Sequence, residues 1–575
     1  MNNNLVVTDF VVFGIYFVLL VAYGLFIYNR KKKKSVSETH DFFLAEGSLT
    51  WWAIGASLIA SNISAEQFIG MSGDGFFVGT AVAAYEWIAA IALIIIAIWF
   101  MPVYLKNKIY TMPQFLKTRY NETVALIMAV FWLLLYVFVN LTSILYLGAV
   151  AINGLAGNEY LHIIMVALAV FGLIITLGGM KVIGYTDVLQ VFVLIIGGIA
   201  TVYFALTKVS ETFGLGTDAF AGFKMLMNDA PDHFKMILPK PGTDTINAAV
   251  AGDKTSQLAI DKYLLLPGIA MYFAGQWIVN LNYWGCNQYI TQRALGADLK
   301  TARTGILFAG FLKLLMPIIV MLPGIAAYVL HRHEQLAGFN GIKDTAYSSV
   351  LAFLPEGLKG LSVAALTAAI VASLAGKLNS ISTIFTLDIY KKYINRDADE
   401  KKQVWIGRLT VLGAMVLAIV FTWKDLLGIG GEGGFTFIQK YTGFISPGVF
   451  AMFLLGMFWK RTTGAAAIAG LLTGFILSIF FNSFAVSLLG HENILFTALP
   501  TIEEGKQVWR IPFLINMGWS FVFTLLVMIG ISLAGPKVNE KAFDLDKQMF
   551  KVSPTHIVMI VVTIAILAAL YIKLW

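Results

Sequence analysis

The chain has 575 residues, of which 58% are hydrophobic and 13% are charged, and its mean hydropathy is +0.77. Soluble globular proteins average about half apolar and about a quarter charged residues, so the composition excludes that class and indicates a polytopic helical membrane protein. The net charge of +8 comes from Lys and Arg residues between apolar runs, which indicates membrane topology and predicts no nucleic-acid partner. The single cysteine, Cys286, excludes an intramolecular disulfide and a multi-cysteine metal site.

Fourteen apolar segments are long enough to cross about 30 Å of hydrocarbon as helices. We expect these spans at 8–28, 50–71, 78–105, 123–154, 160–179, 185–208, 262–284, 304–331, 345–388, 404–424, 434–458, 463–486, 511–534 and 554–574. The first segment has no basic region before it and no small-residue cleavage site after it. It is therefore expected to be a retained span rather than a signal peptide.

The charges of the loops predict which side of the membrane each loop faces. The basic loops are those at 31–34, 106–119, 181, 293–303, 391–402, 460–461 and 537–551, and they alternate along the chain. Because positive loops face the cytoplasm, we expect both termini and the long 209–261 loop outside. No loop is long enough to contain an enzyme domain, so no enzymatic activity is expected. We expect a multi-pass protein of a bacterial inner membrane, with the lipid bilayer as its surroundings and no obligate protein partner.

Polar residues interrupt two strongly apolar runs between Trp51 and Ala90. The first run contains Asn62, Ser64, Glu66 and Gln67, and the second contains Glu86. A carboxylate at bilayer depth is costly unless it is paired or faces a wet cavity. The pattern therefore predicts a polar site inside the bundle, and the alternative is that Glu86 only cross-links two helices.

The seventh expected span, 262–284, is interrupted in the same way. Its turn and polar residues are Pro267, Gly268, Gly275, Gln276, Asn280, Asn282, Tyr283 and, just beyond it, Asn287. Irregular backbone at membrane depth is tolerated only where it is buried in protein or lines a cavity. The second and seventh spans stand five apart, which predicts an inverted repeat of 50–208 and 262–458, with 8–28 as an additional span and 463–574 as three further ones.

Other polar residues inside apolar runs point to the same cavity. Lys313 has the opposite charge to Glu86 and is its expected partner. The remaining polar residues are Asp187, Ser373, Lys377, Asn379 and Gln439. A cage of amides and charges beside aromatic rings offers paired donors and acceptors, which suits a polyhydroxylated ligand.

Long motifs occur in one order along nearly the whole chain: SLIASNISAEQFIGMSG (57–73), AYEW (84–87), NYWGCNQYITQR (282–293), FLKLLMP (311–317), ALTAAIVASLAGKLNSISTIFTLDIYKKY (365–393), GRLT (407–410) and FIQKYTGFISPG (437–448). With these motifs the chain resembles the sodium/solute symporter family, most closely its bacterial sodium/galactose branch. The resemblance implies an all-α, leucine-transporter-type repeat of five plus five helices with broken helices, working by alternating access.

The resemblance also implies roles for individual residues. Those expected to hydrogen-bond sugar hydroxyls are Asn62, Gln67, Glu86, Asn280, Lys313 and Gln439. Tyr283 is expected to stack under the sugar as an inner gate, and an outer gate is expected from Met71, Tyr85 and Phe435. One hydroxyl of the galactose branch is missing, because Ala89 stands where that branch has a serine; this shifts the preference among hexoses and their derivatives.

A sodium site is implied between the second and ninth spans. Its expected members are the backbone carbonyls of Ala60, Ile63 and Ala369 and the positions of two serine hydroxyls, here Ala372 and Ser373. Lys377 lies one helical turn after Ser373 on the same face, where its charge would compete with sodium. Asp187 matches a residue on the ion path and is a candidate to neutralise Lys377. The alternative for Lys377 is that it extends to the cytoplasmic interface.

These observations predict a symporter that imports a neutral hexose together with Na+. Four alternatives stay open: transport of another polar solute such as a cyclitol, amino sugar, amino acid or vitamin-like acid; proton-coupled sugar transport; uncoupled sugar transport; and a membrane sugar sensor. A carboxylate substrate would be repelled by Glu86, which favours a neutral ligand.

Overall fold

The computed structural model describes residues 5–31, 42–43, 49–64, 66–155, 160–273, 275–336, 339, 341–429, 434–503 and 505–575. Within these residues, ten helices are long and apolar enough to cross a membrane, or eleven if one bent pair is counted as a span. The only strands described there, β1 (Leu499–Glu503) and β2 (Lys506–Arg510), form a small antiparallel hairpin. The prediction of an all-helical membrane protein is confirmed, whereas the count of fourteen spans stays a prediction.

The first half of the chain forms the helices up to the long loop. In order they are α1 (Val7–Lys31), α3 (Trp51–Asn62), η2 (Glu66–Met71), α4 (Ser72–Phe77), η3 (Thr80–Ala83), α5 (Ala84–Ile95), η4 (Ile96–Phe100), α6 (Met101–Lys106), α7 (Met112–Arg119), α8 (Glu122–Leu135), η5 (Tyr136–Leu141), α9 (Thr142–Leu155), α10 (Leu161–Leu177) and α11 (Met180–Thr212). The loop and the segment that follows it contain α12 (Ala219–Asp229), η6 (Pro231–Phe234), α13 (Thr243–Val250), α14 (Lys254–Leu265) and η7 (Gly268–Tyr272).

The second half contains the other broken helix and the C-terminal spans. Its elements are α15 (Gly275–Cys286), α16 (Gln288–Leu295), α17 (Leu299–Val320), α18 (Leu322–Arg332), η8 (Lys343–Thr345), α19 (Ala346–Leu351), α20 (Leu358–Thr383), η9 (Ile384–Ile394), α21 (Glu400–Thr422), α23 (Gly434–Gly443), α24 (Ser446–Phe458), α25 (Gly464–Ile479), η10 (Phe480–Phe484), α26 (Ala485–Leu489), α27 (Phe513–Leu533), η11 (Lys547–Phe550) and α28 (Pro554–Leu574). The division into two repeats stays a prediction.

The centre of the bundle is formed by α3, α11, α17 and α20. In α3 every residue from Ala53 to Asn62 is buried, and α20 is buried over nearly its whole length. These helices pack mainly on one another, α3 against α11 and α17, and α20 against α11. Peripheral helices such as α21 and α28 expose apolar faces instead, as expected for surfaces that contact lipid.

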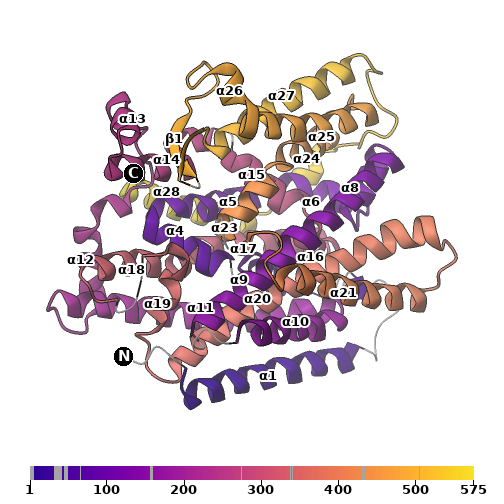
Figure 1. The fold of residues 1–575 in the computed structure, drawn as a ribbon. Helices are drawn as coiled ribbons and strands as arrows, with labels where there is room; N and C mark the ends of the chain where they lie inside the picture. The colour runs from indigo at the N-terminus through magenta and orange to yellow at the C-terminus, as the bar shows by residue number, and fades with distance from the viewer. Residues whose placement is uncertain are drawn as a thin grey trace.

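Both chain ends lie on the side of the bundle that carries the 209–261 loop (Figure 1). The backbone amide of Met236 in that loop donates to the carbonyl of Leu574 over 2.8 Å. At the other end of the chain, Asp9 of α1 accepts hydrogen bonds from the backbone amides of Gly357 and Gly360, each over 2.8 Å. The placement of both termini outside the membrane stays a prediction.

Two helices are broken where polar residues interrupt apolar runs. Helix α3 ends at Asn62, Ile63 is extended at φ −80° and ψ 112°, and helical structure resumes at Glu66. The second break is at Asn287, which is extended at φ −87° and ψ 131° between α15 and α16. In both places the backbone leaves hydrogen-bonding groups without helical partners near the middle of the bundle.

The chain turns within the predicted seventh span, whose boundary stays a prediction. Residues 254–265 form α14, which packs against the β1 strand, and among the described residues Lys254–Tyr272 and Gly275–Cys286 are the bent pair that could form one broken span. Pro267 cannot continue the helix and Gly268 adopts φ +47°, so the chain turns there. The window 262–284 had combined apolar residues from both sides of this turn.

Candidate solute-binding cavity

The two breaks face a common cavity of about 70 Å³, which exceeds the roughly 10–15 Å³ that one water molecule requires. Its lining includes all the residues expected to bind substrate: Asn62, Gln67, Glu86, Asn280, Tyr283, Lys313 and Gln439. They come from α3, η2, α5, α15, α17 and α23, which are far apart in the sequence. The structure therefore brings together in one place the polar residues that the sequence singled out separately.

A buried ion pair forms one wall of the cavity. The ammonium group of Lys313 is fully buried and donates to Glu86 Oε2 and to Asn62 Oδ1. It also lies 5.0 Å from the ring centre of Trp284. Pairing offsets the large cost of removing both charges from water, and the partnership expected between Lys313 and Glu86 is present. The wall that they form has no net charge.

Asn62 connects the two broken helices. Its Nδ2 donates to the hydroxyl of Tyr283 over 3.0 Å, across 221 positions of sequence. The Tyr283 ring packs edge-on against Trp284 and Tyr289, with ring centres 5.1 and 5.7 Å apart. Asn62 at the first break thus positions the ring of Tyr283, which comes just before the second break, beside the cavity.

Amide groups supply hydrogen-bonding capacity around the cavity. Asn280 Nδ2 donates to the backbone carbonyl of Gln276 over 2.9 Å, which fixes the orientation of the amide. Gln67 Oε1 is buried with no hydrogen-bond partner among the described residues. Because buried acceptors are normally satisfied, this orphaned oxygen indicates a position where a bound solute or water completes the hydrogen bonding.

Sequence reasoning missed several residues of this lining. Tyr136 donates to Asn287 Oδ1 over 3.3 Å and accepts from the backbone amide of Gln288 over 3.1 Å, so it satisfies polar groups at the second break. Asn140 also lines the cavity, one turn further on in η5. Asn140 was detectable as a polar residue within the apolar run 123–154. A tyrosine in such a run gives no comparable signal, since tyrosine is common at membrane interfaces.

The three residues predicted for the outer gate have different positions. Tyr85 is buried and lines the cavity. Met71 is fully buried at the end of η2 but does not belong to the lining. The side chain of Phe435 lies outside the described residues, so its role stays a prediction.

The residues predicted to bind sodium lie at the ends of α3 and along α20, which pack together. Ala372 has no hydroxyl group. The Ser373 hydroxyl donates to the backbone carbonyl of Ser61 over 3.2 Å and accepts from Lys377 Nζ over 2.8 Å. A hard cation needs five or six oxygen ligands that are free to coordinate it, so this donor set does not fit sodium.

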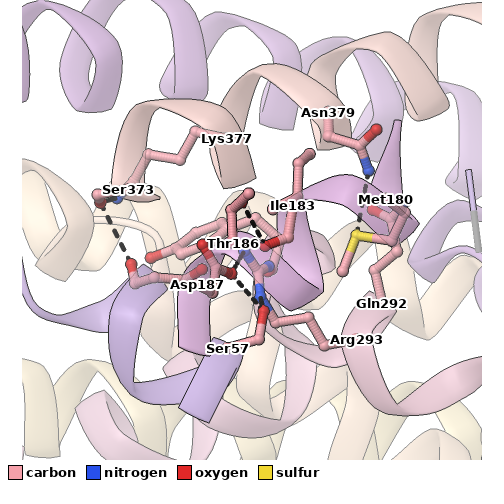
Figure 2. A network of polar contacts seen from close by, with 12 residues as sticks. Ser57, Met180, Ile183, Thr186, Asp187, Gln292, Arg293, Ser373, Lys377 and Asn379 are labelled. Atoms are coloured by element: carbon pink, nitrogen blue, oxygen red, sulfur yellow. Dashed lines mark hydrogen bonds and ion pairs between the residues drawn. The ribbon is translucent and has the colours of Figure 1, made fainter. Parts of the chain in front are cut away.

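The structure contradicts one sequence-based alternative for Lys377 and shows a partner for Asp187 that was not predicted. Lys377 is only 2% exposed and points along α20 to Ser373, rather than extending to the membrane interface (Figure 2). The buried carboxylate of Asp187 accepts from Ser57 and lies 3.6 Å from Arg293 Nη2. Arg293 in turn donates from Nε to Ser57 Oγ over 2.7 Å. Asp187 therefore neutralises an arginine of α16, which the sequence analysis had not considered.

A helical membrane bundle whose two broken helices meet at a polar cavity has the architecture of a secondary transporter. Residues 42–474 match the model of the sodium:solute symporter family. A sodium/glucose cotransporter of Vibrio parahaemolyticus is 40% identical over 590 aligned residues, covering 100% of this chain and 99% of the relative. The chain belongs to the sodium:solute symporter family.

Other relatives extend this comparison. A sodium/myo-inositol cotransporter of Mus musculus is 33% identical, over 83% of this chain and 67% of that protein. The solved structure of a Na+-coupled sialic acid symporter in its substrate-bound outward-open state shares the fold, with a TM-score of 0.73 at 18% identity, over 93% of this chain and 99% of that one. These findings confirm the predicted fold class and, at the level of the family, sodium as the coupling ion.

Proposed function

We propose that this protein imports a neutral hexose by sodium-driven alternating access, as a multi-pass protein of the cell's inner membrane with both termini outside. The observation that carries the proposal is the cavity at the two helix breaks, whose lining pairs amides with one neutral ion pair and an aromatic ring. The sodium/glucose cotransporter of Vibrio parahaemolyticus, which aligns over the full chain, supports a sugar as the solute.

The charges of the cavity favour a neutral solute. Lys313 and Glu86 already cancel each other, so an anionic or cationic ligand would introduce an unpaired charge into a buried site. Amides such as those of Gln67 and Asn280 both donate and accept hydrogen bonds, which matches the two capacities of a sugar hydroxyl. The Tyr283 ring offers an apolar face to the C–H groups of a pyranose.

The contact between Asn62 and Tyr283 suggests how binding is linked to movement. A sugar hydroxyl that takes the place of the Tyr283 hydroxyl at Asn62 Nδ2 breaks the side-chain bond between the two broken helices. The helices are then held together through the solute, and its departure leaves them free to separate. Solute and conformation are linked because the solute stabilises the state in which both helices contact it.

A cyclitol such as myo-inositol is the second candidate. Ala89 lines the cavity with a methyl group where a hydroxyl would add one more hydrogen bond, so one face of the site is less selective for a particular sugar hydroxyl. Relatives named sodium/myo-inositol cotransporters also align over more than four-fifths of the chain, at 33% and 32% identity.

Uptake into proteoliposomes tests the proposal. Purified protein would be given labelled glucose, galactose or myo-inositol under an inward sodium gradient, with an equal choline gradient as the control at constant pH. Concentrative uptake of a hexose with sodium, and its loss in Glu86→Gln, is the expected result. Concentrative uptake of myo-inositol alone would establish the second candidate, and no uptake of any of the three would overturn both.

A further inference from the structure

A second polar network, formed by residues outside the lining of the solute cavity, is shown in Figure 2. It joins α3, α11, α16 and α20 through Ser57, Asp187, Arg293, Ser373 and Lys377. Lysine is rarely buried in a protein unless its ammonium group has partners. The contacts of Lys377 are therefore the starting point.

Lys377 is linked to both broken helices, to the first one through Ser373. On one side its Nζ donates to Ser373 Oγ over 2.8 Å, and that hydroxyl donates over 3.2 Å to the carbonyl of Ser61, next to the first break. On the other side Nζ lies 4.6 Å from the ring centre of Tyr289 in α16. A cation over an aromatic ring is attracted by the negative face of the ring, and more strongly in a dry site. Tyr289 also lines the solute cavity and packs against Tyr283.

The charge of this network opposes a further cation. Its charged members are Lys377, Arg293 and Asp187, so it already carries more positive than negative charge. Arg293 lies close to the backbone of α20. A Cβ atom added at Gly376 would be 2.5 Å from Arg293 Nη2. Like charges at such short range repel strongly in a medium of low dielectric constant. A sodium ion at Ser373 would face Lys377 in direct contact with the same oxygen.

We propose that Lys377 is a resident cation that takes the place of sodium between α3 and α20. Its ammonium group connects Ser61 at the first break, through Ser373, with Tyr289 beside the second break. At the site predicted for sodium, the protein itself thus supplies the positive charge that a bound sodium ion would otherwise supply. Any sodium ion that drives uptake binds outside Ala60, Ile63, Ala369, Ala372 and Ser373. This inference rests on the proposed function only for its place in a transport cycle.

Binding of labelled sodium to the purified full-length protein tests the inference without requiring transport. Sodium would replace choline at constant ionic strength, and the amount bound and its half-saturation would be measured for the wild type, Ser373→Ala, and Ala372→Ser combined with Lys377→Met. Lys359→Met is the matched control, because Lys359 is a second buried lysine of α20, at 6% exposure, far from Ser373. Thermal unfolding of each variant in sodium and in choline would provide a second readout.

We expect Ser373→Ala to bind sodium with an affinity within about twofold of the wild type. If Ser373 were a sodium ligand, its loss would weaken the affinity about tenfold or more. The double variant should bind about one more sodium ion per chain and be stabilised by sodium, unlike Lys359→Met. A tenfold weakening in Ser373→Ala would overturn the inference, as would a folded double variant that binds no additional sodium. If the double variant does not fold, the Ser373→Ala result decides. Absence of sugar uptake would contradict the proposed function and leave this outcome unaffected.

Discussion

The amide of Asn62 and the hydroxyl of Tyr283 are joined by a 3.0 Å hydrogen bond that closes the gap between two broken helices. Asn62 is the last residue of α3, and Tyr283 lies one turn before the break at Asn287. The bond is a direct side-chain link between the two broken helices, so its loss removes one contact that holds them together.

Replacing Tyr283 with phenylalanine keeps the ring and removes the bond to Asn62. A neutral hydrogen bond contributes about 1 kcal/mol net, so states in which the broken helices have separated should become about fivefold more populated. The rate of thiol labelling at Cys286, which is buried directly before the second break and is the only cysteine of the chain, measures this population. Tyr571→Phe, which removes a hydroxyl bond to Tyr272 elsewhere, is the control. Equal labelling rates in the two variants would contradict the prediction.

Replacing Lys313 alone should cost more folding stability than replacing Lys313 and Glu86 together. Lys313→Met leaves Glu86 buried without its partner, which costs about 3–5 kcal/mol of folding stability. Adding Glu86→Gln removes the orphaned charge, so the double variant should regain most of this loss while solute binding stays weak. Thermal unfolding in detergent compares the wild type, the single variants and the double variant. Additive losses in the double variant would show that the two side chains are not energetically paired.

His233 should make stability depend on pH. This residue of the 209–261 loop is buried, stacks on Tyr328 with ring centres 3.9 Å apart, and contacts the carbonyl of Phe76 through Nε2 over 3.0 Å. Burial lowers its pKa from 6.5 to about 4. Between these values the unfolded chain binds a proton that the folded protein does not, so stability falls as the pH decreases from 6.5 to 4.

His233→Gln removes this titration and should flatten the pH dependence of the melting temperature in that window. His491, an exposed histidine that stacks on Trp509, is the matched control when changed to glutamine. If the wild type and His233→Gln lose stability in parallel between pH 6.5 and 4, other groups are responsible.

Close backbone packing between α18 and α4 should make one glycine irreplaceable. A Cβ atom at Gly324 would lie 1.8 Å from the carbonyl oxygen of Ser72, which cannot move away as a flexible side chain would. Gly324→Ala should therefore cost about 3 kcal/mol and reduce the yield of monodisperse protein. A Cβ atom at Gly413 of α21 meets nothing within 4 Å, so Gly413→Ala should behave like the wild type in size-exclusion chromatography and thermal unfolding.

The residues that line the solute cavity were largely predictable, because a polar side chain in a membrane span must pair with another group or face a wet cavity. Asn62, Gln67 and Glu86 interrupt the hydrophobic pattern of their segments. Polar side chains at bilayer depth are stable only inside the bundle, and all three line the same cavity. The opposite charges of Lys313 and Glu86 were enough to predict their pairing. Tyr136 was missed because its ring fits an apolar run and only its hydroxyl reaches the second break.

Partners within the second network were not predictable from spacing. Helical periodicity placed Lys377 on the face of Ser373, but it carries no information on which direction a long side chain takes. The contact of Asp187 with Arg293 was not foreseen, because Arg293 had been placed in a loop, whereas it belongs to helix α16. The turn at Pro267 and Gly268 within the seventh predicted span was not placed for a related reason, because hydropathy averages over it.

The carboxylate of Asp9 caps the start of α20, the helix whose far half carries Lys377. Helix α1 lies outside the predicted repeats, yet its Asp9 side chain accepts hydrogen bonds from two backbone amides at the start of a helix in the centre of the bundle. Any displacement of the start of α20 would therefore have to break both hydrogen bonds to Asp9 or carry α1 with it.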